Sequence, residues 1–141
     1  MSNMDFFIWP RKMKSFLDSN INKKLKGTDF TASQVPFIIA IGEREGASMK
    51  VICGALGIDK GLATRVVKAL VENGYVVNRS EVGRTSKLYL TDKGRWAFDL
   101  AMANMEQTLD QILECLDEHE LSCLKEISRK IGDRLDELYK H

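Results

Sequence analysis

Several features are scarce in this chain of 141 residues. No apolar run approaches the roughly 18–20 residues that cross a bilayer, which argues against an integral membrane protein. The first residues lack a basic start followed by an apolar run of about 7–15 residues, so they are a poor secretory signal. Three cysteines without a Cys-x-x-Cys pair argue against a disulfide framework and fit a reducing cytoplasm. We therefore expect a cytoplasmic protein with no membrane partner.

Residues for catalysis and metal binding are also scarce. The chain has two histidines, one of them the terminal His141, and it lacks a glycine-rich phosphate loop, a nucleophile elbow and a metalloprotease motif. Cys115, His119 and Cys123 have the spacing that would align three ligands on one helix. A helix break expected at Asp117 would misplace Cys115, and a structural zinc site normally has four ligands. We expect no enzyme activity, no cofactor and no metal.

The charge is distributed unevenly along a chain that is 44% apolar and 29% charged, a composition typical of one globular domain. The formal net charge is +1, yet residues 49–95 carry nine basic and four acidic side chains, whereas residues 96–141 carry five and eleven. A basic middle and an acidic end indicate one surface made for an anion and another turned away from it. A gradual drift in composition is the alternative.

Hydrophobic periodicity and capping residues predict six helices. The first is expected from Pro10, placed in its first turn, to a stop near Gly27. The second begins at the capping box formed by Thr31 and Gln34, and Pro36 should make its first turn irregular. Four further helices are expected: 49–56 after a cap at Ser48, 60–73 after a cap at Asp59, one from a cap at Thr91 and one from a cap at Asp117.

The hydrophobic period changes between the fourth and fifth helices. Two short β-rich runs, 75–77 and 88–90, flank a polar loop that contains Gly83, as in a hairpin. The fold class predicted is mainly α with a small β-hairpin wing. The order helix, short break, helix, hairpin is that of a winged helix-turn-helix lobe with N- and C-terminal helices on either side.

The helix pair 49–56 and 60–73, with Gly57 in the turn, predicts a DNA-reading surface. Burial of one face of the second helix leaves the opposite face to solvent, and it carries Lys60, Gly61, Thr64, Arg65 and Lys68. The hairpin adds polar side chains that can reach a minor groove or the DNA backbone, namely Arg79, Arg84, Ser86 and Lys87. Each cation alone is equally well explained as a solvated surface charge. Whether Arg65 contacts guanine or a phosphate stays open.

At this point the sequence resembles the MarR family of transcriptional regulators. The resemblance covers roughly residues 28–100 and rests on FTASQVPFIIAI, on SMKVICGALGIDKGLATRVVKALVENGYVVNRS and on LYLTDKG. Two departures stand out. Gly61 weakens the first turn of the recognition helix, and the wing stretch Val82-Gly83-Arg84 keeps one arginine of the acidic and basic cluster that the family usually has, with Glu81 as the nearest acid.

The resemblance implies a homodimer that reads a pseudo-palindromic double-stranded DNA operator, expected to act as a repressor. Residues 1–30 and 96–141 would supply the dimerisation helices and residues 31–95 the DNA-binding lobe of a single domain spanning 1–141. A monomer that uses the same apolar seams for its own core is the alternative. A different class of function, a winged-helix protein–protein interaction module without specific DNA binding, also stays open because of Gly61 and the reduced wing.

Family members often bind a small aromatic or phenolic effector between the dimerisation helices and the DNA-binding lobe, and then release DNA. The candidate lining residues here are Trp9, Phe37, Trp96 and Met102. Ordinary core packing is the competing explanation for each of them.

Overall fold

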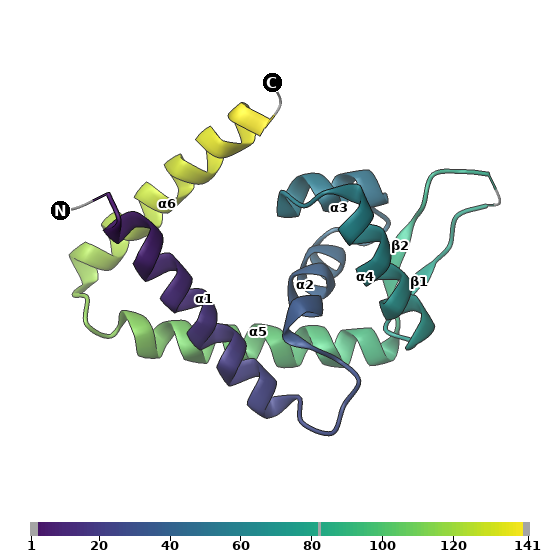
Figure 1. Cartoon of the computed structure of the whole chain (residues 1–141), viewed down its shortest axis with the longest axis horizontal. Helices are drawn as coiled ribbons and strands as arrows, with labels where there is room; N and C mark the ends of the chain where they lie inside the picture. The colour runs from purple at the N-terminus through teal and green to yellow at the C-terminus, as the bar shows by residue number, and fades with distance from the viewer. Residues whose placement is uncertain (1–2, 82, 140–141) are drawn as a thin grey trace. The chain divides into compact units, whose positions relative to one another are not determined.

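The computed structural model describes residues 3–81 and 83–139. Its elements in chain order are α1 (Asp5–Lys24), a 3₁₀ turn η1 (Ala32–Gln34), α2 (Val35–Glu43), α3 (Met49–Leu56), α4 (Lys60–Glu72), β1 (Val76–Asn78), β2 (Leu88–Leu90), α5 (Asp92–Leu113) and α6 (Glu118–Tyr139) (Figure 1). The predicted fold class, mainly α with a small hairpin, is confirmed. The chain packs as two compact units, one ending at Glu106 and one beginning at Gln107, inside α5.

The first unit is built around α2, whose sequence VPFIIAIGE is almost wholly apolar. Phe37, Ile38 and Ile41 are buried, and the helix contacts η1, α3 and β2. Ile52 of α3 and Leu70 of α4 complete this core. A helix that is apolar on all sides is stable only when other elements cover it, so α2 is the support on which the helix-turn-helix pair and the hairpin rest.

The start of α1 corrects one prediction. The helix begins at Asp5, so Pro10 lies inside it rather than in its first turn. Proline removes the hydrogen bond that its N–H would give to the carbonyl of Phe6. Because that carbonyl is one turn from the helix end, the loss does not stop the helix.

The second helix begins irregularly, as Pro36 predicted. The Thr31 N–H donates to Oε1 of Gln34 at 3.0 Å, and the expected capping box between these two residues is present. The turn that follows is 3₁₀, closed by the Gln34 N–H on the Thr31 carbonyl, and the α-helix starts one residue later at Val35.

The hairpin is antiparallel, with Val76 opposite Leu90, Val77 opposite Tyr89 and Asn78 opposite Leu88. A bridge between Ala47 and Leu88 ties its second strand to the segment before α3. Val76, Leu88 and Leu90 are buried, so the base of the hairpin is part of the core and its loop extends from a fixed support.

The second unit contains the end of α5 and helix α6. The helix break expected at Asp117 is present: the Glu120 N–H donates to Oδ1 of Asp117 at 2.8 Å, and the Asp117 N–H donates to Oε1 of Glu120 at 3.1 Å. No residue of α6 is buried, although its sequence is strongly amphipathic. In the described part of the chain, no helix has the length and apolar character that a bilayer-spanning segment needs.

Candidate nucleic-acid interface

Local signals in the sequence shape the helix-turn-helix pair. The Val51 N–H donates to Oγ of Ser48 at 3.2 Å, and the Leu62 N–H donates to Oδ1 of Asp59 at 3.0 Å. Both predicted N-caps are therefore present. Gly57 ends α3 at φ 65°, a left-handed conformation that costs a glycine little, and lets the chain turn at once into α4.

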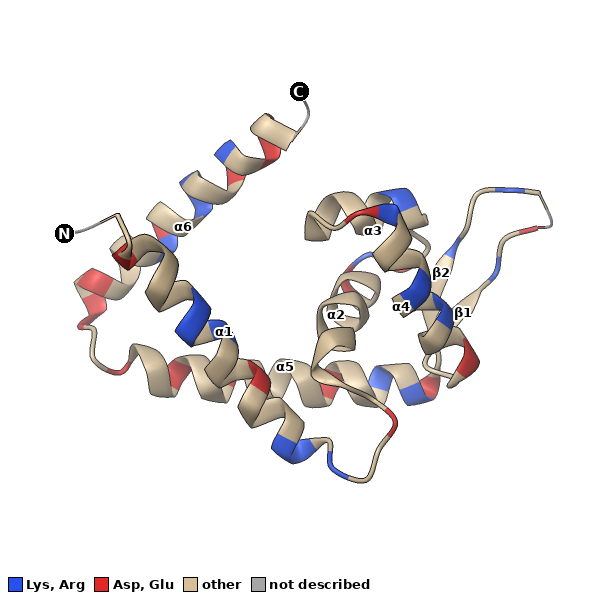
Figure 2. Cartoon of the chain, viewed as in Figure 1, with Lys and Arg blue, Asp and Glu red and all other residues tan. Residues whose placement is uncertain are grey.

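Helix α4 separates a buried face from a charged face. Ala63, Val67 and Leu70 are buried against the core. The five residues predicted for the recognition surface all lie exposed on the helix: Lys60, Gly61, Thr64, Arg65 and Lys68. In Figure 2, blue ribbon marks the positions of Lys and Arg on α4 and on the neighbouring hairpin.

The cations of α4 differ from others of the first unit in their ion pairing. Within the described residues, Lys60, Arg65 and Lys68 make no ion pair, whereas Lys14, Lys93 and Arg95 of the same unit each pair with a carboxylate. An exposed row of unpaired cations on one helix face is suited to bind a polyanion.

Two other positions on this face are partly engaged within the helix. The Thr64 hydroxyl donates to the Lys60 carbonyl at 2.7 Å, which leaves the oxygen lone pairs to accept a hydrogen bond from a ligand. A Cβ built on Gly61 would lie 3.2 Å from Oδ1 of Asp59, the capping oxygen. The lack of a side chain at Gly61 therefore leaves room for the Asp59 carboxylate that caps the helix.

The hairpin loop is closed at its base by Asn78. Its Oδ1 accepts from the Ser80 N–H at 3.1 Å and from the Lys87 N–H at 3.0 Å. The Arg79 N–H donates to the Lys87 carbonyl at 2.9 Å, and the Arg79 guanidinium lies over the Tyr89 ring at 4.8 Å from its centroid. Arg79 and Lys87 are therefore held side by side where the loop joins the two strands.

The remaining wing residues differ in their freedom. Arg84 is exposed, with Nε 3.9 Å from a carboxylate oxygen of Glu81, a loose pair that a phosphate can replace. The hydroxyl of Ser86 accepts from the Met49 N–H at 2.9 Å, so Ser86 ties the wing to the start of α3. Val82, part of the predicted wing stretch, lies outside the described residues.

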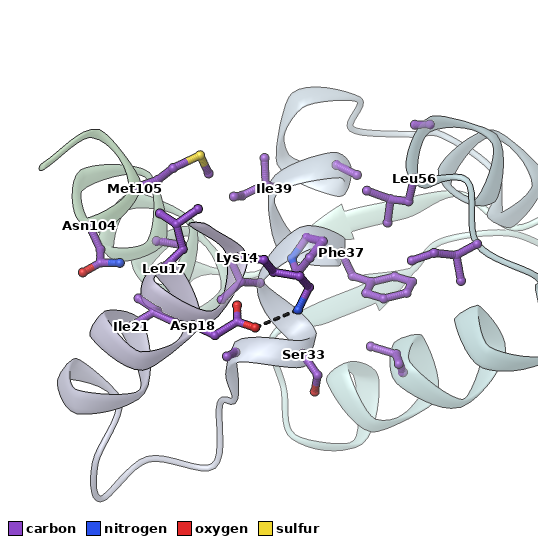
Figure 3. A pocket seen from close by; sticks show the side chains of 18 of the residues that line it. Lys14, Leu17, Asp18, Ile21, Ser33, Phe37, Ile39, Leu56, Asn104 and Met105 are labelled. Atoms are coloured by element: carbon purple, nitrogen blue, oxygen red, sulfur yellow. Dashed lines mark hydrogen bonds and ion pairs between the residues drawn. The ribbon is translucent and has the colours of Figure 1, made fainter. Parts of the chain in front are cut away.

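A largely apolar pocket of about 670 Å³ opens in the first unit (Figure 3). Residues of η1 and of helices α1 to α5 line it, among them Met13, Leu17, Phe37, Leu62, Val66 and Met105. At one side Nζ of Lys14 pairs with Oδ2 of Asp18 at 2.7 Å. The pocket wall therefore includes the face of α4 that lies behind its cations.

Of the four predicted effector residues, the structure brings only Phe37 to this pocket. Trp9 and Trp96 are 53% and 48% exposed, and neither lines it. Met102 is half-buried on α5 and also lies outside the lining. Residue type alone suggested these positions, whereas the cavity is set by how the helices are spaced.

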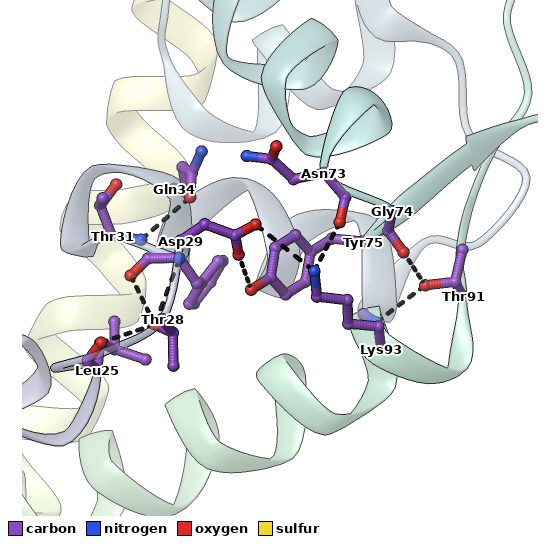
Figure 4. Close-up of polar contacts among 12 residues, drawn as sticks. Leu25, Thr28, Asp29, Thr31, Gln34, Asn73, Gly74, Tyr75, Thr91 and Lys93 are labelled. Atoms are coloured by element: carbon purple, nitrogen blue, oxygen red, sulfur yellow. Dashed lines mark hydrogen bonds and ion pairs between the residues drawn. The ribbon is translucent and has the colours of Figure 1, made fainter.

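One polar cluster was not foreseen from the sequence (Figure 4). The Tyr75 hydroxyl donates to Oδ1 of Asp29 at 2.5 Å, and Nζ of Lys93 lies 3.6 Å from Oδ2 of the same carboxylate. The hydrogen bond from Tyr75, aided by the charge of Lys93, holds the pKa of Asp29 below its usual value. Burial, together with the Asp29 carboxylate, raises the pKa of Tyr75 well above the usual tyrosine value.

The cysteines do not assemble a metal centre among the described residues. Cys53 is half-buried, and Cys115 and Cys123 are exposed. Sγ of Cys123 lies 3.7 Å from Nε2 of His119 one turn away, while Sγ of Cys115 donates to the Ile112 carbonyl. His141, the other histidine, lies outside the described residues.

Known proteins are similar to this chain in sequence and in fold. A family model described as MarR family matches residues 28–84. The chain is 32% identical over 98 residues to the HTH-type transcriptional regulator BilQ of Clostridium symbiosum, covering 68% of each protein. It is 28% identical over 130 residues to the transcriptional repressor MprA of Escherichia coli, covering 89% of this chain and 74% of MprA.

The fold is also that of a MarR family transcriptional regulator from Listeria monocytogenes solved in complex with a 26mer DNA. The TM-score is 0.83 at 20% identity, over 97% of this chain and 91% of that one. A winged helix-turn-helix lobe whose second helix has an exposed basic face is typical of DNA-binding proteins. The chain belongs to the MarR family of transcriptional regulators.

Proposed function

We propose that this regulator binds a specific double-stranded DNA operator through α4 and the wing. The observation that carries the proposal is the row of exposed cations on α4, which form no ion pair within the described part of the chain and lie opposite a face fixed to the core. In this arrangement α4 enters the major groove and presents Lys60, Gly61, Thr64, Arg65 and Lys68 to base edges and phosphates. The wing contacts the backbone or the minor groove through Arg79, Arg84, Ser86 and Lys87.

The proposal includes a homodimer. Apolar side chains recur along α6 in steps of three or four residues and remain exposed, with Ile131 at 56% and Leu138 at 53%. On α1, Phe6, Phe7 and Trp9 are exposed as well. Large apolar side chains in such stripes favour a partner surface, and a second copy supplies an identical one. Residues 1–30 and 96–141 then serve dimerisation and residues 31–95 serve DNA binding.

A two-fold dimer reads two half-sites centred about 34–36 Å apart, or a multiple of that distance. We assign the role of repressor because MprA, the relative that aligns over 130 residues, is named a transcriptional repressor. The named relatives come from bacteria, where chromosomal DNA lies in the cytoplasm, and we propose that this regulator acts there.

We further propose that the pocket binds a small aromatic or phenolic effector that lowers DNA affinity. Leu62 and Val66 belong to α4 and line the pocket, so a molecule seated there touches the helix that carries the DNA-facing cations. Phenol and benzoate are suitable probes: each should release a bound duplex from the wild type, and Met13→Trp, which fills part of the pocket, should weaken that response.

Selection of duplexes from a random-sequence library at two salt concentrations tests the DNA-binding proposal. The expected result is a pseudo-palindrome with half-sites about one turn apart. Arg65→Ala should lower affinity for it by about 1–3 kcal/mol and relax preference at one base pair if Arg65 contacts a base. Arg84→Ala should weaken binding to all sequences and flatten the salt dependence.

Arg129→Ala provides a matched arginine removal on α6, where the guanidinium pairs with Asp133. This variant should leave affinity unchanged both for the selected pseudo-palindrome and for other sequences. Weak, unselective binding that disappears at moderate salt would contradict the proposal and favour the protein–protein interaction module instead.

A further inference from the structure

Tyr75 occupies the joint between the two proposed DNA-contacting elements. Helix α4 ends at Glu72, and the first strand of the wing begins at Val76. Tyr75 lies directly before that strand and is 1% exposed. Any rotation at this residue changes the angle between the recognition helix and the wing.

The backbone of Tyr75 is held on both sides. Its N–H donates to the Leu70 carbonyl of α4 at 2.9 Å, and its own carbonyl accepts from the Thr91 N–H at 3.1 Å. The start of α5 packs so closely here that a Cβ on Gly94 would overlap the Tyr75 carbonyl group. The joint is therefore fixed to α4 and to α5 at the same point.

The side chain of Tyr75 connects this joint to the segment between α1 and η1. Its ring lies 5.1 Å from the Phe30 ring, centroid to centroid, and Nζ of Lys93 lies 4.3 Å from its centroid (Figure 4). The hydroxyl donates to Asp29, the neighbour of Phe30, at 2.5 Å. Lys93 also donates to the Asn73 carbonyl at 2.7 Å, just after α4.

These contacts are more directional than packing alone requires. A phenyl ring would fill the same volume, and apolar burial does not depend on ring orientation. A hydrogen bond to an ionised carboxylate does depend on it and is among the stronger hydrogen bonds. The low pKa of Asp29 keeps that carboxylate charged at neutral pH.

We propose that Tyr75 is a positioning residue, held by Asp29 and Lys93, that sets the angle between α4 and the wing required for specific DNA binding. The inference rests on the proposed function. In this role the cluster links the α1–η1 segment to α4 and the wing, so that the position of that segment affects the angle between them. The cluster itself does not contact DNA.

Two variants test the proposal against two probes. Tyr75→Phe removes only the hydroxyl, and Asp29→Asn keeps an acceptor but removes the charge. The probes are a duplex selected from a random library by the wild-type protein and a random-sequence duplex of the same length. Affinity for the selected duplex should fall about 2- to 30-fold in each variant, the range typical of residues that couple two elements. Affinity for the random duplex should stay within about twofold, because every proposed contact residue is retained.

A charge-matched control sharpens the test. Asp29→Asn makes the protein more positive, which by itself favours DNA binding. Asp99→Asn makes the same change on the exposed surface of α5 and should leave affinity for the selected duplex equal or slightly higher. The double variant Tyr75→Phe/Asp29→Asn should lose less affinity than the product of the two single losses, because both substitutions weaken the hydrogen bond that Tyr75 and Asp29 share.

The inference fails if both single variants bind the selected duplex as tightly as the wild type, or if they lose affinity for both duplexes equally. Circular dichroism verifies folding, and if Tyr75→Phe unfolds, the surface substitution Asp29→Asn decides the result. If the wild type selects no sequence, the proposed function itself fails, and that result is seen before any variant is compared.

Discussion

Gly94 provides the sharpest test of how the lobe is packed. It is buried in the first turn of α5, where its N–H donates to the Thr91 hydroxyl at 3.0 Å. A Cβ added there would overlap the Tyr75 carbonyl, 3.1 Å from its carbon, and would lie 3.3 Å from the Leu90 side chain. Since the Tyr75 atoms belong to the backbone, Gly94→Ala requires α5 or the joint to move.

The cost can be assembled from three contributions. Overpacking a well-filled site typically costs about 1–3 kcal/mol. Displacing the Tyr75 carbonyl weakens its bond with the Thr91 N–H, worth about 1 kcal/mol. Alanine recovers somewhat less than about 1 kcal/mol through its higher helix propensity. We expect Gly94→Ala to lower the free energy of unfolding by about 1–3 kcal/mol.

Gly54→Ala is the matched control. Gly54 is exposed within α3, and a Cβ there would have no atom within 4 Å. This substitution should raise the free energy of unfolding by about 0.5–1 kcal/mol. Urea denaturation of both variants, at the same protein concentration, measures the difference. If Gly94→Ala is as stable as Gly54→Ala, the close packing of α5 on the joint is refuted.

Three further predictions follow from the same structure. Because the pKa of Tyr75 is raised in the folded state, its contribution to stability is complete below the ordinary tyrosine value of 10.0 and is lost as pH rises above it. Melting temperatures from pH 7 to 11 should therefore fall more steeply for wild type than for Tyr75→Phe, and parallel curves would contradict this. Ser48→Ala removes the cap of α3 and should cost about 1 kcal/mol in urea denaturation, whereas Ser122→Ala on exposed α6 should cost less than half of that. Leu135→Asp, in the apolar stripe of α6, should shift the proposed dimer to monomer in sedimentation experiments, because burying such a side chain contributes about 1.5–3 kcal/mol per copy. Asp136→Ala beside it is the control, and a dimer that Leu135→Asp leaves unchanged would show that α6 is not at the interface.

The sequence predicted well what local rules determine. The caps at Ser48, Asp59 and Asp117 depend on side chains within three residues of the N–H groups they satisfy, so a short stretch of sequence contains both partners. The buried face of α4 is likewise recorded in its own periodicity. The predicted start of α1 was wrong because proline is typical of the first turn of a helix, whereas this helix begins earlier, at Asp5, and continues through Pro10.

The features that sequence reasoning missed depend on distant partners. Tyr75 and Asp29 are 46 residues apart, and nothing local to either residue indicates the other. The LTDKG stretch was recognised only as a resemblance, whereas the structure supplies a reason for its glycine, the closeness of the Tyr75 backbone. The lining of the pocket likewise depends on distant partners, since five helices contribute to it and Trp9 and Trp96 do not.

The cations of the first unit divide into two groups, and the division explains how a chain of nearly neutral net charge can hold a polyanion. Lys93 and Arg95 are paired with Asp29 and Glu45 near the base of the lobe, where they fasten α5 to the preceding segments. Lys60, Arg65 and Lys68 on α4 have no acidic partner among residues 3–81 and 83–139. Pairing them would neutralise the surface and require an ion pair to break before each phosphate contact formed, whereas unpaired cations exchange only water and counterions. Net charge is therefore a poor guide to this protein, because the proposed DNA contacts depend on which cations the fold gathers on one exposed face.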